Sequence, residues 1–226
     1  MAQASGPRPG LGSVVKRHVR WLRRSPMPVR DAAQVGFALV FRRRGHLVAS
    51  TVRYRGARRV VHDGPFYFGI LCNRLFHAPG DRGALLIHDA GTLVIGADVK
   101  IAASARITVG GHLAIGSHTR INHGAKILAN TVVTIGEGVA MGPECLILDD
   151  DLHDLTVAGV PRTKRAAITV ADRVWIGSRC TLLKGTEIGE GSIIAAGSVV
   201  TGVIPAGVVA GGSPARVLAT AASWTP

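Results

Sequence analysis

The chain has 226 residues, of which 47% are apolar and 18% are charged, and 29 of them are glycine. This length and apolar content suffice to bury a core, which excludes an intrinsically disordered protein, and glycine without a three-residue period excludes a collagen-like one. The formal net charge is +13. Residues 1–60 contain 14 basic side chains and one acidic side chain, whereas the other 166 residues contain 13 of each. The excess charge therefore belongs to an N-terminal segment and not to the main body.

Residues 1–62 are expected to form a basic, partly helical extension. In residues 13–24, apolar side chains recur on one face of a helix, and arginines and lysines occupy the rest. A helix within residues 13–44 would suit contact with an anionic membrane surface, and a solvated arm that packs on the main body is the alternative. A nucleic-acid partner is not indicated, because the main body is neutral and has no recognised reading motif.

The sequence also bears on the compartment. No apolar run reaches the roughly eighteen residues that a membrane-spanning helix requires, and the basic N-terminus is not followed by the apolar stretch of a signal peptide. Cys72, Cys145 and Cys180 are odd in number and far apart, which indicates neither a disulfide framework nor a thiolate zinc site. We expect a cytoplasmic protein with Cys145 and Cys180 in its core.

The main body is a repeat with a period of six residues. Aliphatic side chains recur at this spacing in two blocks. The first block runs from Ile95 to Ile147 and restarts every twenty residues, and the second runs from Val170 to Val200 without interruption. Small residues often stand four positions after the aliphatic one. They are Ala105, Ala125, Cys145, Cys180, Thr186, Ser192 and Ser198.

A period of six fits neither an α-helix, which needs spacings of three and four, nor a hairpin strand, which needs strict alternation. It fits short strands joined by tight corners. Each hexapeptide would form one flat face, three faces would close a triangular coil, and the aliphatic side chain would point inward. A spacing of twenty then corresponds to a coil of eighteen residues with two extra at a corner. Successive coils would stack about 4.8 Å apart, so that each buries the face of the last.

These residues resemble the hexapeptide-repeat acyltransferases, and the resemblance covers about Gly91 to Leu218. Its most specific segments are Val174–Ser178, Gly191–Val200 and Ala210–Val217. Within the family, the chain is most similar to the sugar and polysaccharide O-acetyltransferases of the galactoside and maltose acetyltransferase type. The resemblance implies acetyl-CoA as co-substrate, no required metal ion, a sugar or glycosylated acceptor, and a homotrimer.

The family fold is all-β, a left-handed parallel β-helix. We expect it over residues 63–218, followed by a C-terminal tail over residues 219–226. The six-residue pattern fails between Ile147 and Val170, so residues 148–169 are expected to leave the β-helix as a loop. Loops that leave a rigid scaffold often carry function, so this excursion is the first place to look for chemistry.

The excursion contains three aspartates followed by Leu152 and His153. A histidine with carboxylates beside it can take a proton from a hydroxyl that attacks a thioester. The family's catalytic histidine sits on this excursion, often within Asp-x-His. The resemblance therefore assigns His153 as the general base and Asp151 as its acidic partner. A solvated acidic loop with an incidental histidine is the alternative.

The resemblance also implies residues on either side of the transferred group. Asn122 matches an asparagine that binds the acceptor, although an asparagine at a corner can also serve backbone groups. On the donor side, Ser178, which follows Gly177, would supply a backbone N–H for the oxyanion. Trp175 would flank the slot for the pantetheine arm, or could equally pack between subunits.

Ala196 and Thr201 match positions whose backbone lines the pantetheine arm, and Arg216 matches a basic residue near the nucleotide phosphates. Ala196 and Thr201 also obey the hexapeptide pattern, which explains them without a ligand. Relatives commonly carry lysine after the threonine, where this chain has glycine. Lys164 and Arg165 on the excursion are therefore alternative phosphate ligands.

Three histidines indicate a rival site. His112, His118 and His123 fall within twelve residues, and the spacing of the last two is that of two zinc ligands in γ-class carbonic anhydrases, which share the β-helix. The third ligand has no clear counterpart, because Arg82 stands at the family's position with His88 nearby. An acyl-CoA-dependent O-acetyltransferase is the main prediction. A zinc enzyme that uses His118 and His123 and a non-catalytic β-helix scaffold are the alternatives.

Overall fold

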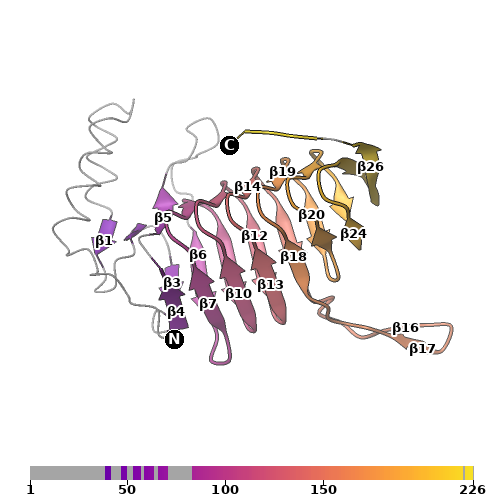
Figure 1. Cartoon of the computed structure of the whole chain (residues 1–226). Coiled ribbons are helices and arrows are strands. Elements are labelled where there is room, and N and C mark those ends of the chain that lie inside the picture. The colour runs from indigo at the N-terminus through magenta and orange to yellow at the C-terminus, as the bar shows by residue number, and fades with distance from the viewer. Residues whose placement is uncertain are drawn as a thin grey trace, which may run out of the picture.

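The computed structural model describes residues 39–41, 47–49, 53–56, 59–63, 66–70, 83–220 and 222–225. These residues form short strands that wind around one axis (Figure 1). Within them, no helix is long and apolar enough to cross a membrane. The predicted partly helical segment and its membrane contact through residues 13–44 lie outside the described residues, apart from strand β1 (Leu39–Phe41).

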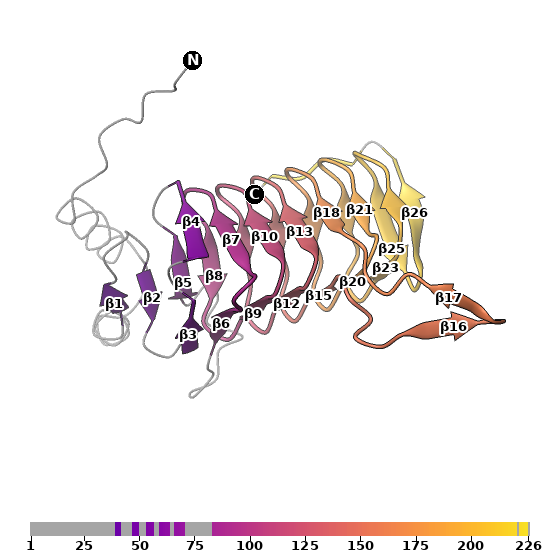
Figure 2. The ribbon, with the colours of Figure 1, turned by 90° about the horizontal axis from the view of Figure 1, so that it is seen from below.

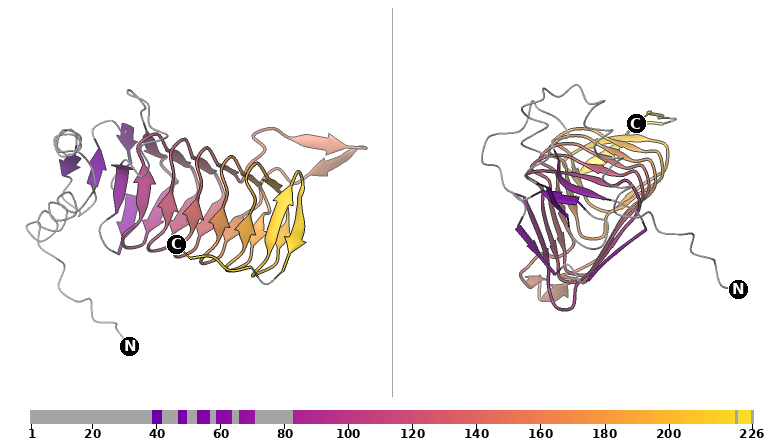
Figure 3. Two further views of the ribbon diagram at one scale, coloured as in Figure 1. Left: turned by 90° about the horizontal axis from the view of Figure 1, so that it is seen from above. Right: turned by 90° about the vertical axis from the view of Figure 1, so that its left-hand side faces the viewer.

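Three sheets form the faces of a prism, which Figure 3 shows from its end. Sheet A consists in spatial order of β1, β2 (Leu47–Ala49), β5 (Tyr67–Ile70), β8 (Lys100–Ala102), β11 (Arg120–Ile121), β14 (Ala140–Met141), β19 (Trp175–Ile176), β22 (Ile193–Ile194), β25 (Val209–Gly212) and β26 (Ala215–Ala219). Sheet B consists of β3 (Arg53–Arg55), β6 (Ala84–Ile87), β9 (Arg106–Val109), β12 (Lys126–Ala129), β15 (Leu146–Leu148), β20 (Thr181–Leu183) and β23 (Val199–Val200). Sheet C consists of β4 (Val60–His62), β7 (Thr92–Ile95), β10 (His112–Ile115), β13 (Val132–Ile135), β18 (Ile168–Val170), β21 (Glu187–Ile188) and β24 (Val203–Ile204).

The chain visits sheets B, C and A in turn, and one visit to all three completes a coil. The corners from A to B are called the A–B edge, those from B to C the B–C edge, and those from C to A the C–A edge. The register confirms the predicted repeat, because Ile95, Ile115 and Ile135 pair across three coils of sheet C. The two extra residues of the longer coils lie between sheets B and C, where β12 and β13 have four residues each.

Inward aliphatic side chains fill the prism. The predicted inward positions from Ile95 to Val200 are all buried, and so are the predicted small residues at the corners. Each fully buried aliphatic side chain contributes about 1.5–3 kcal/mol to folding. Polar side chains at the corners of the core form hydrogen bonds with the backbone. For example, the Thr186 hydroxyl donates to the carbonyl oxygen of Val200 at 2.9 Å. The predicted fold class, a parallel β-helix of hexapeptide repeats, is therefore confirmed.

The β-helix begins before the predicted boundary at residue 63. Strand β3 pairs with β6 in sheet B and β4 pairs with β7 in sheet C, so strands of an earlier coil precede that residue. The aliphatic pattern is hidden there because β3 has the sequence Arg-Tyr-Arg and contains no aliphatic residue. At the other end, β26 folds back antiparallel on β25 and ends sheet A at Ala219.

Between β15 and β18 the chain leaves the prism, as predicted. The excursion runs from residue 149 to 167, slightly less than the predicted 148–169, because Leu148 still belongs to β15 and Ile168 begins β18. It forms an antiparallel hairpin of β16 (Leu155–Val157) and β17 (Val160–Arg162). Figure 2 shows this hairpin projecting from the C-terminal half of the stack. All residues of its two strands are exposed.

Candidate active site

The base of the hairpin is held by three consecutive aspartates, each with different partners. The first, Asp149, is fully buried. Its carboxylate accepts hydrogen bonds from the backbone N–H groups of Asn130 at 2.8 Å and Thr131 at 2.7 Å, at the B–C edge of the preceding coil. One coil earlier, the equivalent N–H groups donate to a carbonyl oxygen. The Asp149 side chain thus takes the place of the backbone acceptor that the excursion removes.

Asp150 links the two ends of the excursion. Its buried carboxylate accepts hydrogen bonds from the Leu152 N–H at 2.8 Å, the Asn130 side-chain amide at 3.1 Å and the Arg165 guanidinium at 2.8 Å. Burial by itself raises the pKa of the Asp150 carboxyl. The bonds from Leu152, Asn130 and Arg165 outweigh burial, so the pKa lies below its ordinary value of 3.8 and the group is ionised at neutral pH.

Asp151 is bound to the next coil. Its carboxylate accepts a hydrogen bond from the ammonium of Lys184, which stands at the B–C edge directly after β20. The backbone N–H of Asp151 donates to the carbonyl oxygen of Lys164 at 3.0 Å. Lys184 was not among the predicted site residues, because its only signal in the sequence is its place at a corner one coil after the three aspartates. The partner expected for Asp151 was His153, and the partner that the structure gives it is Lys184.

His153 lies directly beyond this base and is exposed. The residue before it, Leu152, has a positive φ of 65°, a backbone conformation rare outside glycine. The Leu152 N–H is fixed by Asp150 at 2.8 Å, so the turn that presents His153 is tied to the buried carboxylate. The imidazole therefore stands at the root of the hairpin, on the side of the B–C edge.

The predicted donor residues lie mainly along the A–B edge. Ser178 follows β19 at this edge, and Ala196 follows β22 at the same edge one coil later. The coils approach closely here, because a side chain at Gly177 would meet the backbone nitrogen of Ala196 at 2.6 Å. No described residue accepts a hydrogen bond from the Ser178 N–H. An oxyanion donor must likewise have no acceptor within the protein.

The other predicted ligands are distributed over several places. Asn122 follows β11 at the A–B edge, two coils before Ser178, and is half-buried. Thr201 is exposed at the B–C edge after β23. Arg216 is exposed on β26, where its guanidinium donates to the carbonyl oxygen of Ala215 at 2.8 Å. A single chain thus brings Asn122, Ser178 and Ala196 to one edge, and His153 and Thr201 to the next.

The basic residues of the excursion are engaged within it. Lys164 forms an ion pair with Asp154 at 3.3 Å, and Arg165 forms one with the buried Asp150 at 2.8 Å. These contacts make both side chains part of the hairpin base. Of the three predicted phosphate ligands, Arg216 is the one that has no acidic partner among the described residues.

Cys145 and Cys180 lie in the core, as predicted. They occupy the same inward position on successive coils, and the Cys145 thiol donates to the carbonyl oxygen of Gly177 at 3.1 Å. A hydrogen bond with Cys180 and burial raise the pKa of the Cys145 thiol. Buried sulfur at this position fills space between coils and is not exposed to a substrate.

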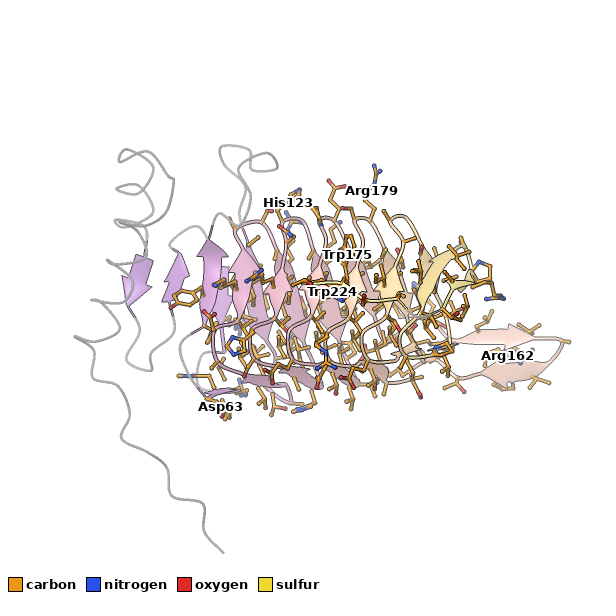
Figure 4. The ribbon with its side chains drawn as sticks, turned by 45° about the horizontal axis from the view of Figure 1, so that its top comes forward. Asp63, His123, Arg162, Trp175, Arg179 and Trp224 are labelled. Atoms are coloured by element: carbon orange, nitrogen blue, oxygen red, sulfur yellow. The ribbon has the colours of Figure 1, made fainter. Side chains whose placement is uncertain are left out.

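The three histidines of the rival zinc site do not converge within one chain. His112 lies on the outer side of β10, where its Nδ1 is 2.7 Å from the Thr92 hydroxyl. His118 lies at the C–A edge and its Nδ1 is 3.7 Å from a carboxylate oxygen of Asp98. His123 lies at the A–B edge, as Figure 4 shows. The described residues contain no group of three or more side chains placed to hold a metal ion.

The six-residue repeat of this chain matches repeats of known proteins. Residues 167–202 match the family model described as bacterial transferase hexapeptide (six repeats). This stretch includes Trp175, Gly177, Ser178, Ala196 and Thr201. The galactoside O-acetyltransferase of Escherichia coli is 37% identical over 100 residues, which are 43% of this chain and 48% of the relative. The chain thus spans about half the length of that relative.

A second relative and a solved structure extend the comparison. The 2,3,4,5-tetrahydropyridine-2,6-dicarboxylate N-acetyltransferase of Clostridium perfringens is 48% identical over 64 residues, which are 27% of each chain. The crystal structure of NeuO, a polySia-specific acetyltransferase, is 21% identical with a TM-score of 0.52, and the match covers 80% of this chain and 79% of NeuO. At this level of identity the structural match shows the shared fold.

Proposed function

We propose that this chain, which carries the hexapeptide repeat of bacterial transferases, is an O-acetyltransferase that uses acetyl-CoA. The acceptor would be a hydroxyl of a sugar, a polysaccharide precursor or a glycosylated molecule. The observation that carries the proposal is the combination of two features on the coil that β15, β18 and β19 form. One is the unbonded Ser178 N–H within the matched repeat, and the other is a histidine on an excursion that buried aspartates fix.

The proposed reaction is direct transfer. The hydroxyl oxygen of the acceptor attacks the thioester carbonyl carbon while His153 takes the hydroxyl proton. The tetrahedral oxyanion accepts a hydrogen bond from the Ser178 N–H. When it collapses, the carbon–sulfur bond breaks, and the leaving thiolate takes the proton back from the imidazolium. The products are the acetyl ester and free CoA, and no acyl-enzyme forms.

Donor binding would follow the A–B edge. The pantetheine arm is narrow, and Gly177 and Ala196 present backbone without bulky side chains there. Trp175 on sheet A would line the arm, and the exposed Arg216 would meet the nucleotide phosphates. The backbone of Thr201, one coil further on, would contribute from the B–C edge. Because acetyl-CoA is abundant in the cytoplasm, we keep a cytoplasmic location as part of the proposal.

Two chains would contribute to each site. Ser178 and His153 lie on opposite edges of sheet B within one chain. A homotrimer would allow the hairpin of one subunit to place His153 against the A–B edge of its neighbour. Asn122, which shares that edge with Ser178, would then face the acceptor. In this arrangement Asp151 keeps its bond with Lys184 and acts through the position of the hairpin.

The decisive experiment measures thiol release from acetyl-CoA with a panel of sugars and glycans as acceptors. We expect release with at least one carbohydrate, and a kcat about 10²–10⁴-fold lower in His153→Ala. The matched control is His88→Ala, at an exposed histidine three coils before the hairpin, which should keep wild-type turnover. Absence of release with every acceptor would overturn the activity, and full turnover in His153→Ala would overturn the role of the base.

A further inference from the structure

The indole of Trp175 is covered by the C-terminal segment of the same chain. Trp175 points outward from β19, and its neighbours in the register of sheet A are Ala140 and Ile193. The ring of Trp224 packs against it with centroids 6.1 Å apart and planes tilted by 44°. Figure 4 shows the two side chains together over sheet A. Nothing in the sequence pattern predicts this pair.

The segment that carries Trp224 is fixed at two points along the C–A edge. The Ala222 N–H donates to the carbonyl oxygen of Gly207 at 2.8 Å, in the last coil. The Trp224 Nε1–H donates to the carbonyl oxygen of Arg173 at 2.6 Å, two coils earlier. On the coil between them, Glu190 pairs with the Arg173 guanidinium. The segment therefore crosses successive coils, and the Trp224 indole has one defined place.

Trp224 covers only part of its neighbour. Trp175 remains 45% exposed, which is unusual for a large aromatic side chain that packs on another one. The C-terminal segment reaches Trp175 from the C–A edge, whereas Ser178 lies at the opposite, A–B edge of sheet A. The covered side of the Trp175 ring thus faces the segment, and the ring lies between that segment and the proposed oxyanion donor.

We propose that Trp224 is a positioning residue, which holds the indole of Trp175 as one wall of the acyl-CoA site. The inference rests on the proposed function. A side chain that is already immobile loses no rotamer freedom when a ligand binds, so preorganisation strengthens binding. The contact lies on the donor side of the reaction and away from His153. Its effect therefore falls on donor binding and not on the chemical step.

The test compares three variants of the full chain. Trp224→Ala removes the ring and the Nε1–H, Trp224→Phe keeps an aromatic face, and Ser223→Ala alters an exposed position of the same segment. For each, CoA binding is measured by calorimetry and the KM for acetyl-CoA and kcat by thiol release. We expect Trp224→Ala to raise the KM for acetyl-CoA and the Kd for CoA about three- to tenfold with kcat within about twofold. Trp224→Phe should recover part of the loss, and Ser223→Ala should match wild type.

The outcomes separate this inference from the proposed function. If the wild-type chain binds no CoA, the proposed function fails, and the inference fails with it. If wild type binds CoA and Trp224→Ala binds it equally well or more tightly, the positioning role is wrong while the proposed function stands. A fall in kcat with unchanged KM would likewise overturn it. Thermal unfolding of each variant tests whether the fold is intact, and we expect it to be, because Trp224 lies outside the prism.

Discussion

Lys184 donates a hydrogen bond to the carboxylate of Asp151, and this bond ties the coil after the hairpin to the hairpin base. The two residues are 33 positions apart in the chain, and both side chains are only partly exposed, at 23% and 35%. The carboxylate of Asp149 binds the coil before the hairpin, so these bonds together anchor the excursion to the coils on both sides of it. The anchoring matters because the candidate base follows Asp151 by two residues.

Removal of the Lys184 ammonium should loosen the hairpin base with little effect on folding. In Lys184→Met, we expect kcat to fall about three- to tenfold, because a small misplacement of a catalytic group lowers the rate strongly. The free energy of unfolding should change by about 1 kcal/mol or less, as for other partly exposed ion pairs. Steady-state kinetics and urea denaturation measure the two quantities. Lys126→Met, at an exposed position of sheet B, is the control, and an equal fall in its kcat would contradict the assignment.

Asp149 should matter mainly for stability. Asp149→Ala would leave the N–H groups of Asn130 and Thr131 without their acceptor at a half-buried corner. We expect the free energy of unfolding to fall by about 1–3 kcal/mol, because a donor left unsatisfied costs about 1–3 kcal/mol when buried and less where water reaches it. Denaturation in urea provides the measurement. A change below about 0.5 kcal/mol would show that water or a shifted backbone replaces the carboxylate.

Asp150 should make the stability depend on pH in the acid range. Its folded-state pKa is lowered, because hydrogen bonds from Leu152, Asn130 and Arg165 outweigh burial. A lowered pKa means that the stabilisation is fully present above the ordinary value of 3.8 and is lost as the pH falls through the folded-state pKa. The stability difference between wild type and Asp150→Asn should therefore be constant near neutral pH and shrink below about pH 4. Denaturation curves across this range test it, and a constant difference down to about pH 2 would refute it.

Ser178 should act through its backbone and not through its hydroxyl. Ser178→Ala keeps the N–H, so we expect kcat within about threefold of wild type. Ser178→Pro removes the N–H and should lower kcat about 10²–10³-fold, as for loss of an oxyanion donor. Proline suits the position, because the next residue, Arg179, has a positive φ of 56°, a pattern that favours proline just before it. If Ser178→Pro folds and retains wild-type kcat, another group stabilises the oxyanion.

Chelation should leave the transferase activity unchanged. A base and a backbone N–H suffice for acyl transfer, and His112, His118 and His123 lie at three different places of the prism. After dialysis against EDTA we expect thiol release at the wild-type rate. Metal analysis of the purified protein accompanies the assay. Stoichiometric zinc together with loss of turnover on chelation would favour the carbonic-anhydrase-like alternative.

The periodicity of the chain predicted stacked triangular coils by itself, whereas the left-handed winding was expected from the resemblance to the family. An aliphatic residue at every sixth position has only one way to be buried on each face of a triangular coil, so the inward set from Ile95 to Val200 could be listed before any coordinates. The excursion was visible for the same reason, as a gap in the period. The start of the β-helix before residue 63 was not visible, because strand β3 contains no aliphatic residue.

Only the tertiary structure decided the partners of the site residues. The resemblance to the family's Asp-x-His motif predicts Asp151 as the partner of His153, and stacking of coils adds Lys184 as a partner that the motif does not include. Stacking likewise places Trp224 on Trp175 and leaves Ser178 and His153 on different edges. Which residues of one coil point inward follows from the six-residue period, and this period can be read in the sequence. Which residues of neighbouring coils lie side by side depends on the number of residues in each coil. The hairpin adds residues to one coil and the C-terminal segment returns across several coils, so the contacts that they make cannot be predicted from the six-residue period.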